Sequence, residues 1–222
     1  DLRKQLKSIE QHVRAIKAFE EAAARYEGKL LTKISENEKL EILQLRGGVL
    51  FTKAGAHARQ KQILEAMQNY RAAANDFKSI HQKDIAGTAL YELGQLHLDG
   101  GNLQEAVAAF SEVVEVAEPE GLSRLAMLGH FGLARAFETL SEFQKALANY
   151  QVALRWHRTN KDHDTTTFEP GMLLHMGYIH RWLSRYEEAI EHFRLAVQKY
   201  REKKDLRGEA DALTQLGEVF TW

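Results

Sequence analysis

The feature that most constrains the fold is an internal repeat built from small and aromatic residues. An alanine followed four residues later by an aromatic residue recurs along the chain, at intervals of 40, 40 and 43 residues. The pairs are Ala66 with Tyr70, Ala106 with Phe110, Ala146 with Tyr150, and Ala189 with Phe193. An earlier copy contains Ala15 and Phe19. A fixed period of this length predicts repeated units whose neighbours stack and share a continuous core.

A small residue also recurs in the segment that lies before the alanine and aromatic pair. Gly94, Ala134, Gly177 and Gly217 follow a large apolar residue at the same place in four segments. We expect the small residues to lie where the two helices of a pair cross, and the aromatic residue to fill the space beside them. The chain has only two prolines, Pro119 and Pro170, and no Gly, Ser or Pro stretch typical of a linker. Since proline inside a helix costs about 3 kcal/mol, this composition favours helices throughout.

The coarse secondary-structure prediction is therefore all helix. The predicted helices lie near 2–27, 38–53, 60–80, 86–99, 103–117, 122–139, 143–158, 170–183, 187–203 and 208–221. Turns are predicted at Gly28, Gly55, Gly100-Gly101, Pro119 to Gly121 and 160–169. Asp84 and Asp205 are candidate helix caps.

These residues resemble the tetratricopeptide repeat (TPR) family, whose pattern is Leu-Gly, an aromatic, then alanine, an aromatic and alanine. The period of about 40 exceeds the usual 34 and is similar to the longer form of the family. The resemblance implies an all-α, right-handed α-solenoid of antiparallel helix pairs with four to five repeats. The expected organisation is a second helix of a truncated preceding repeat plus linker at 1–37, then repeats at 38–80, 86–118, 122–158, 170–204 and an incomplete one at 208–222.

The resemblance also implies where a partner would bind. First helices of successive TPR pairs line a concave groove, and the residues carried over to that groove are Tyr91, Gln95, Phe131, Arg135, Glu138, Tyr178, Arg181 and Trp182. Aromatic residues and arginine are typical of protein-binding hot spots. We expect a protein or peptide with apolar anchors and at least one acidic group. Phe131 could instead simply pack between neighbouring first helices.

Composition and motifs exclude several other classes. A net charge of −1 argues against nucleic acid as a partner, and no apolar run approaches the roughly 20 residues that span a bilayer. With no cysteine in the chain, disulfides and cysteine-based metal sites are impossible. Neither a phosphate-binding loop nor a nucleophile motif is present, so we expect no enzyme activity and no cofactor. A cytoplasmic location is the simplest interpretation.

The chain has ten histidines, which are candidate metal ligands. His175 and His180 are five residues apart, which does not place them on one helix face. His157, His163 and Asp164 form only a loose group around a loop, whereas zinc needs three or four ligands in fixed geometry. We therefore predict no metal site.

Two functions remain open. The first is a protein–protein interaction module that holds a partner protein or peptide in the concave groove. The alternative is a ligand- or peptide-sensing regulatory domain of a larger signalling protein. Helix faces left uncovered at the two ends could also support a homo-oligomer.

Overall fold

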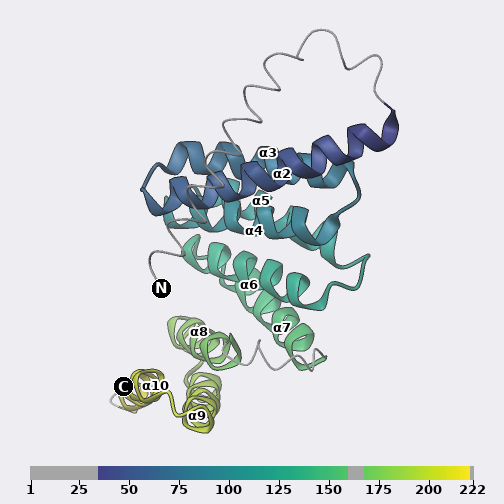
Figure 1. Cartoon of the computed structure of the whole chain (residues 1–222). Helices are drawn as coiled ribbons and strands as arrows, with labels where there is room; N and C mark the ends of the chain where they lie inside the picture. Colours follow the sequence, from purple (N-terminus) through teal and green to yellow (C-terminus); the bar gives the residue numbers. More distant parts are fainter. Residues whose placement is uncertain (1–34, 160–167, 221–222) are drawn as a thin grey trace. The chain divides into compact units, whose positions relative to one another are not determined.

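The computed structural model describes residues 35–159 and 168–220, which form nine α-helices and contain no strand (Figure 1). The helices are α2 (Glu36–Arg59), α3 (Ile63–Ser79), α4 (Lys83–Asp99), α5 (Leu103–Ala117), α6 (Ser123–Thr139), α7 (Phe143–Thr159), α8 (Phe168–Trp182), α9 (Tyr186–Glu202) and α10 (Leu206–Val219). The predicted TPR-like fold of helix pairs is confirmed. The helix predicted near 2–27 and the turn at Gly28 lie outside the described residues.

The chain divides into two compact units, and the boundary falls inside α4, between Leu93 and Gly94. In the first unit α2 packs against α3. In the second unit α6 pairs with α7 and α8 with α9, while α10 packs against α9 and α8. Almost every helix is thus held by its neighbours in sequence, as expected for a repeat array.

Where the connection between consecutive helices is described, it is a short turn with one residue in the left-handed conformation. In each turn a backbone N–H bonds to the carbonyl five residues earlier, as Asn102 does to His97 and Asp205 to Tyr200. This is the Schellman arrangement, which satisfies the last carbonyls of a helix. The left-handed residues are Lys61, His81, Gly101, Gly121, Ser141, Ser184 and Lys204. They recur every 20 residues except between Ser141 and Ser184, where the interval is longer. One helix with its turn therefore takes 20 residues, and a helix pair takes 40.

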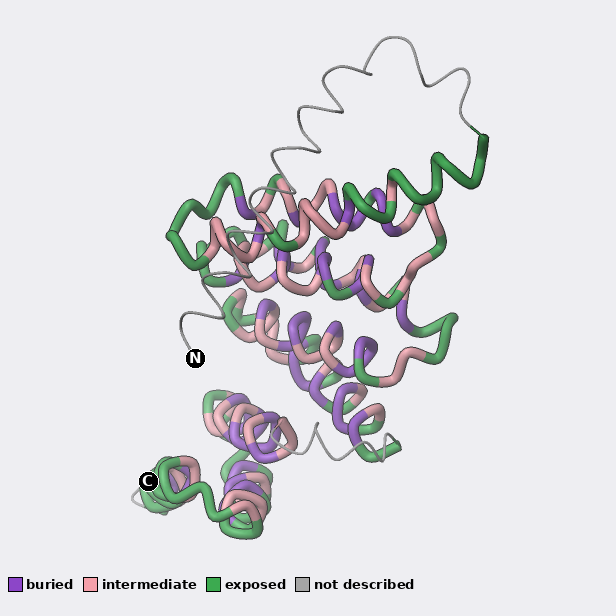
Figure 2. Tube along the Cα trace, in the orientation of Figure 1, coloured by how far each residue is buried: buried purple, intermediate pink, exposed green. Residues whose placement is uncertain are grey.

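In the core, an aromatic ring of one helix packs against a glycine of a neighbouring helix. A Cβ atom added at Gly94 of α4 would lie 2.6 Å from the ring of Phe110, and one added at Gly177 of α8 would lie 2.5 Å from the ring of Phe193. Phe110 also packs against Gly132 of α6. Both rings are fully buried, and buried residues follow the facing sides of the helices (Figure 2). The close crossing predicted from the small residues is therefore present.

The first unit contains a charged pair in its helix interface. Arg46 of α2 donates two hydrogen bonds to Asp76 of α3, from Nε to Oδ2 at 2.7 Å and from Nη2 to Oδ1 at 2.5 Å. Asp76 is only 5% exposed. Hydrogen bonding to Asp76 raises the pKa of Arg46, so the guanidinium keeps its charge and its two hydrogen bonds fix α2 against α3.

Two local predictions were wrong. The turn predicted at Gly55 does not form, because α2 continues to Arg59. Glycine inside a helix costs about 1 kcal/mol, but the adjacent Ala54 is fully buried and lies 40 residues before Gly94, so packing keeps this stretch helical. Asp84 lies within α4 and does not precede it. By contrast, the Asp205 side chain caps α10 and accepts a hydrogen bond from the Gly208 amide at 3.0 Å.

Candidate functional site

An open pocket of about 390 Å³ lies in the second unit, where α6 and the turn after it meet α8. Its lining residues are Arg135, Glu138, Thr139, Ser141, His175 and Trp182. The volume is at the lower end of the range for ligand sites. Such a pocket suits one or two side chains of a partner better than a large cofactor.

Glu138 is the most strongly held of these side chains. Tyr150, which is fully buried on α7, donates its hydroxyl hydrogen bond to Glu138 Oε2 at 2.7 Å. His175 Nδ1 lies 3.2 Å from Glu138 Oε1, and its ring stacks on Tyr150 with 5.8 Å between centroids. Burial and the Glu138 charge raise the pKa of Tyr150, so the phenol keeps its proton. The carboxylate is thus fixed from two sides.

Arg135 has a neutral hydrogen-bond partner. Its Nη1 donates to Gln95 Oε1 at 3.2 Å, and its guanidinium lies 6.0 Å from the centroid of Phe131. Phe131 in turn packs against Tyr150 and Phe168. The ring and the amide position the guanidinium without neutralising it, which leaves its charge available to a partner.

The other arginine of the predicted groove is already paired. Arg181 Nη1 donates to Glu218 Oε2 of α10 at 2.5 Å, and Tyr178 donates to Asp211 Oδ1 at 3.3 Å. Burial, with the neighbouring Asp211, raises the pKa of Tyr178 to about 12. These two contacts attach α8 to α10, so both side chains are committed within the chain.

Trp182 is the apolar wall of the pocket. It is 55% exposed and packs against Phe143 of α7 with 5.3 Å between ring centroids. An exposed tryptophan held on one side by another ring can cover an apolar side chain of a partner at low entropic cost.

The eight predicted groove residues therefore fall into distinct places. Three of them line the pocket, namely Arg135, Glu138 and Trp182. Gln95 and Phe131 contact Arg135. Tyr178 and Arg181 form hydrogen bonds with α10. Tyr91 lies half-buried on the part of α4 that belongs to the first unit. His175 also lines the pocket, although the repeat pattern did not predict it as a groove residue. Its contact with Glu138 joins residues 37 positions apart, and no local pattern signals such a contact.

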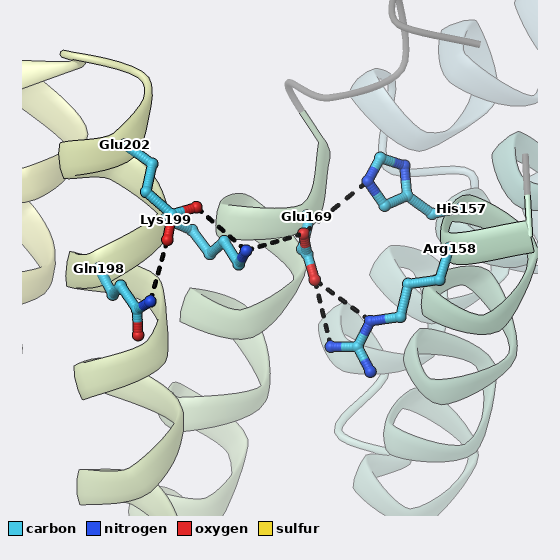
Figure 3. Close-up of polar contacts among 6 residues, drawn as sticks. All are labelled: His157, Arg158, Glu169, Gln198, Lys199 and Glu202. Carbon is cyan, nitrogen blue, oxygen red and sulfur yellow. Dashed lines mark hydrogen bonds and ion pairs between the residues drawn. The ribbon is translucent and has the colours of Figure 1, made fainter. Parts of the chain in front are cut away.

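A second polar cluster surrounds Glu169 at the start of α8 (Figure 3). Arg158 of α7 donates from Nη2 to Glu169 Oε1 at 3.1 Å, while His157 Nε2 and Lys199 Nζ each lie 3.9 Å from Oε2. Burial lowers the pKa of His157, although the Glu169 charge opposes this shift. One carboxylate thus connects α7, α8 and α9, which makes this cluster a structural junction.

Within residues 35–159 and 168–220, no three His, Asp or Glu side chains come together as a metal site would require. None of the helices in the same part of the chain is long and apolar enough to cross a membrane.

Solved structures similar to this one share its helical repeat fold. The apo form of RapI matches with a TM-score of 0.69 and 16% identity, over 98% of this chain and 80% of that one. Aspartyl phosphate phosphatase F from Bacillus subtilis matches with a TM-score of 0.68 and 17% identity, over 96% of this chain and 52% of that one. At these identities the likeness concerns the fold, and the phosphatase name belongs to that protein.

The sequence relatives indicate the family. The human alpha-soluble NSF attachment protein is 26% identical over 158 residues, which is 62% of this chain and 52% of the human protein. The chain thus spans about half the length of the curated relatives it matches. The family model described as "Soluble NSF attachment protein, SNAP" matches residues 49–213, about three quarters of the chain. The chain therefore belongs to the soluble NSF attachment protein (SNAP) family.

Proposed function

We propose that this chain is a protein–protein interaction module and not an enzyme, and that it holds a segment of a partner protein in the pocket between α6 and α8. The observation that carries the proposal is that two features from different helices line one pocket. Arg135 keeps its charge beside a neutral partner, and Trp182 offers an exposed apolar ring. Its SNAP relatives are named for attachment to another protein, which supports a binding role.

The two features define the chemistry of the partner. An acidic side chain would bind Arg135, because Arg181 is already paired with Glu218. An apolar side chain next to it would cover Trp182. Glu138 is held by Tyr150 and His175, so it would shape the pocket rather than pair with a cation of the partner. We place this interaction in the cytoplasm.

The test compares Arg135→Gln with Arg124→Gln, an exposed arginine on the same helix that lies outside the pocket lining. Partners captured by the parent chain are identified by mass spectrometry, and affinities are then measured with the purified partner. A charge-assisted hydrogen bond contributes about 1.5–3 kcal/mol, so Arg135→Gln should weaken binding roughly tenfold or more. Arg124→Gln should bind like the parent. Equal binding by all three proteins would place the interface elsewhere.

The sensing role is the second candidate and would use the same pocket. A free peptide and a segment of a folded protein differ in how they engage it. If short acidic-apolar peptides bind as tightly as the purified partner and displace it, the sensing role is favoured. If the peptides bind at least a hundredfold more weakly than the partner, the scaffold role is favoured.

A further inference from the structure

The ring of His175 has two nitrogen atoms in different surroundings. Nδ1 lies 3.2 Å from Glu138 Oε1 and 3.1 Å from Glu138 Oε2. Because a carboxylate only accepts hydrogen bonds, Nδ1 carries a proton and donates to it. For Nε2 there is no hydrogen-bond partner within residues 35–159 and 168–220. The side chain is 37% exposed and lines the pocket, so Nε2 is available to a molecule bound there.

Neighbouring side chains hold the ring in this orientation. It stacks on the ring of Tyr150 with 5.8 Å between centroids and an interplanar angle of 16°. Tyr178 contacts it edge-on, with 6.0 Å between centroids. Tyr150 also donates a hydrogen bond to Glu138, so one residue positions both the ring and its acceptor. A flip of the ring would break the bond from Nδ1 to Glu138, so Nε2 stays on the side of the pocket.

The protonation state of His175 decides what Nε2 offers to a partner. A neutral imidazole with its proton on Nδ1 has a lone pair at Nε2, which accepts hydrogen bonds and repels a carboxylate. An imidazolium has a proton on both nitrogens, so Nε2 becomes a donor on a cation. Histidine is the side chain whose charge changes between about pH 5 and pH 8. The same atom is thus an acceptor at high pH and a charged donor at low pH.

The imidazolium would be a second cation in the pocket. The titratable groups that face the ring or share its pocket are Arg135 and Glu138 of α6, Tyr150 of α7 and Tyr178 of α8. Glu138 is already engaged by His175 Nδ1 and by Tyr150. A bound acidic group would therefore meet two positively charged donors, the Arg135 guanidinium and His175 Nε2. Hydrogen bonds between ionised partners are about twice as strong as those between neutral groups.

We propose that His175 is a specificity-determining residue of the pocket, and that its imidazolium form binds the same acidic group of the partner as Arg135 does. This proposal rests on the proposed function, because it concerns the same pocket. It specifies a partner segment whose carboxylate accepts hydrogen bonds from both side chains and whose affinity rises as pH falls from 8 to 6. A neutral amide in the same place would gain far less, since it carries no charge.

The first test follows His175 by NMR in the full chain, with 13C and 15N in its histidines. At pH 8 the 15N shifts of the free chain should show a proton on Nδ1 and none on Nε2. Two probes, the capped tripeptides Leu-Asp-Leu and Leu-Asn-Leu, differ by one charge, and the aspartate stays ionised from pH 6 to pH 8. Leu-Asp-Leu should bind about fivefold more tightly at pH 6 and raise the titration midpoint of His175 by about 1 pH unit. Leu-Asn-Leu should change by less than about twofold.

Variants assign the pH dependence to its residue. Affinities for Leu-Asp-Leu are measured from backbone amide shifts at pH 6 and pH 8. His175→Gln should remove the pH dependence, because glutamine does not titrate. The matched control is His81→Asn, which changes an exposed histidine of the first unit to a residue that tolerates its left-handed conformation. This control should keep the pH dependence of the parent.

Arg135→Gln separates this proposal from the proposed function. If Arg135→Gln weakens binding but the parent and His175→Gln have the same pH dependence, the pocket still binds the acidic group and the role of His175 is overturned. If Leu-Asp-Leu does not bind, or binds Arg135→Gln as tightly as the parent, both proposals are overturned. A proton on Nε2 in place of Nδ1 at pH 8 would also overturn the role of His175, and this result needs no variant.

Discussion

Two glycines at the same repeat position allow one stability prediction, because only one of them faces an aromatic ring. The same substitution should change the free energy of unfolding in opposite directions at the two positions. The substitutions are Gly177→Ala in α8 and Gly217→Ala in α10. Both replace a helical glycine by the best helix former, so both should gain about 1 kcal/mol from the backbone. They differ in the space that the new methyl group meets.

At Gly177 the new Cβ would lie 2.5, 2.6 and 3.0 Å from Cε1, Cδ1 and Cζ of Phe193. Phe193 is fully buried, so its ring has no open space into which it could move. Overpacking of this kind costs about 1–3 kcal/mol, and a contact this close belongs at the upper end. After the backbone gain is subtracted, Gly177→Ala should lower the free energy of unfolding by about 1–2 kcal/mol.

At Gly217 nothing lies within 4 Å of the new Cβ, so the full gain of about 1 kcal/mol remains. The assay is urea unfolding followed by circular dichroism, with Gly48→Ala as a second open-space control. The two variants should differ by about 2–3 kcal/mol. The reasoning is refuted if Gly177→Ala is as stable as the parent, or if Gly217→Ala is the less stable of the two.

Three other perturbations test separate features. Arg46→Met leaves the Asp76 carboxylate buried without its partner. It should lower the free energy of unfolding in urea by about 2 kcal/mol, a cost reduced from that of a fully buried pair because Arg46 is half exposed. An unchanged unfolding midpoint would contradict this. Burial, with the neighbouring His192, lowers the pKa of His180 below its usual 6.5, so the stability it contributes is present above pH 6.5 and is lost as pH falls below that value. His180→Phe should make the unfolding midpoint less sensitive to pH between 7.5 and 5.5, and an unaltered pH dependence would argue against the assignment. Lys204→Gly should stabilise the chain by up to about 1 kcal/mol, since Lys204 has φ of 58°; a lower melting temperature would show that the left-handed turn carries no strain.

The fold was largely predictable because the residues that repeat in the sequence are the same residues that pack in the core. Ala106, Ala146 and Ala189 are all fully buried, so their spacing reported the period of the structure directly. The turns were harder to locate. Five of the seven left-handed turn residues are not glycine, for example His81 and Lys204, and a residue of this kind gives no sequence signal. Conversely, Gly55 looked like a turn but lies inside α2.

The candidate site was predictable only in part. The repeat register identified Arg135, Glu138 and Trp182 as residues of one face, and all three line the pocket. It could not show which of the two arginines is already paired, because Glu218 contacts Arg181 across 37 residues of sequence. It also missed the link from buried Tyr150 through Glu138 to His175, which depends on side-chain geometry rather than on periodicity.

The packing of α10 has a consequence for local opening. Its described partners are α8 and α9, and Leu206 and Leu213 of α10 stay exposed, so detaching α10 costs fewer buried contacts than opening α8. Its amide hydrogens should therefore exchange with solvent before those of α6 and α8. Each such opening would separate Glu218 from Arg181. Opening of α10 would then free the Arg181 guanidinium. An anion that binds Arg181 only in this open state would shift the equilibrium toward opening, so the amide hydrogens of α10 would exchange faster in its presence.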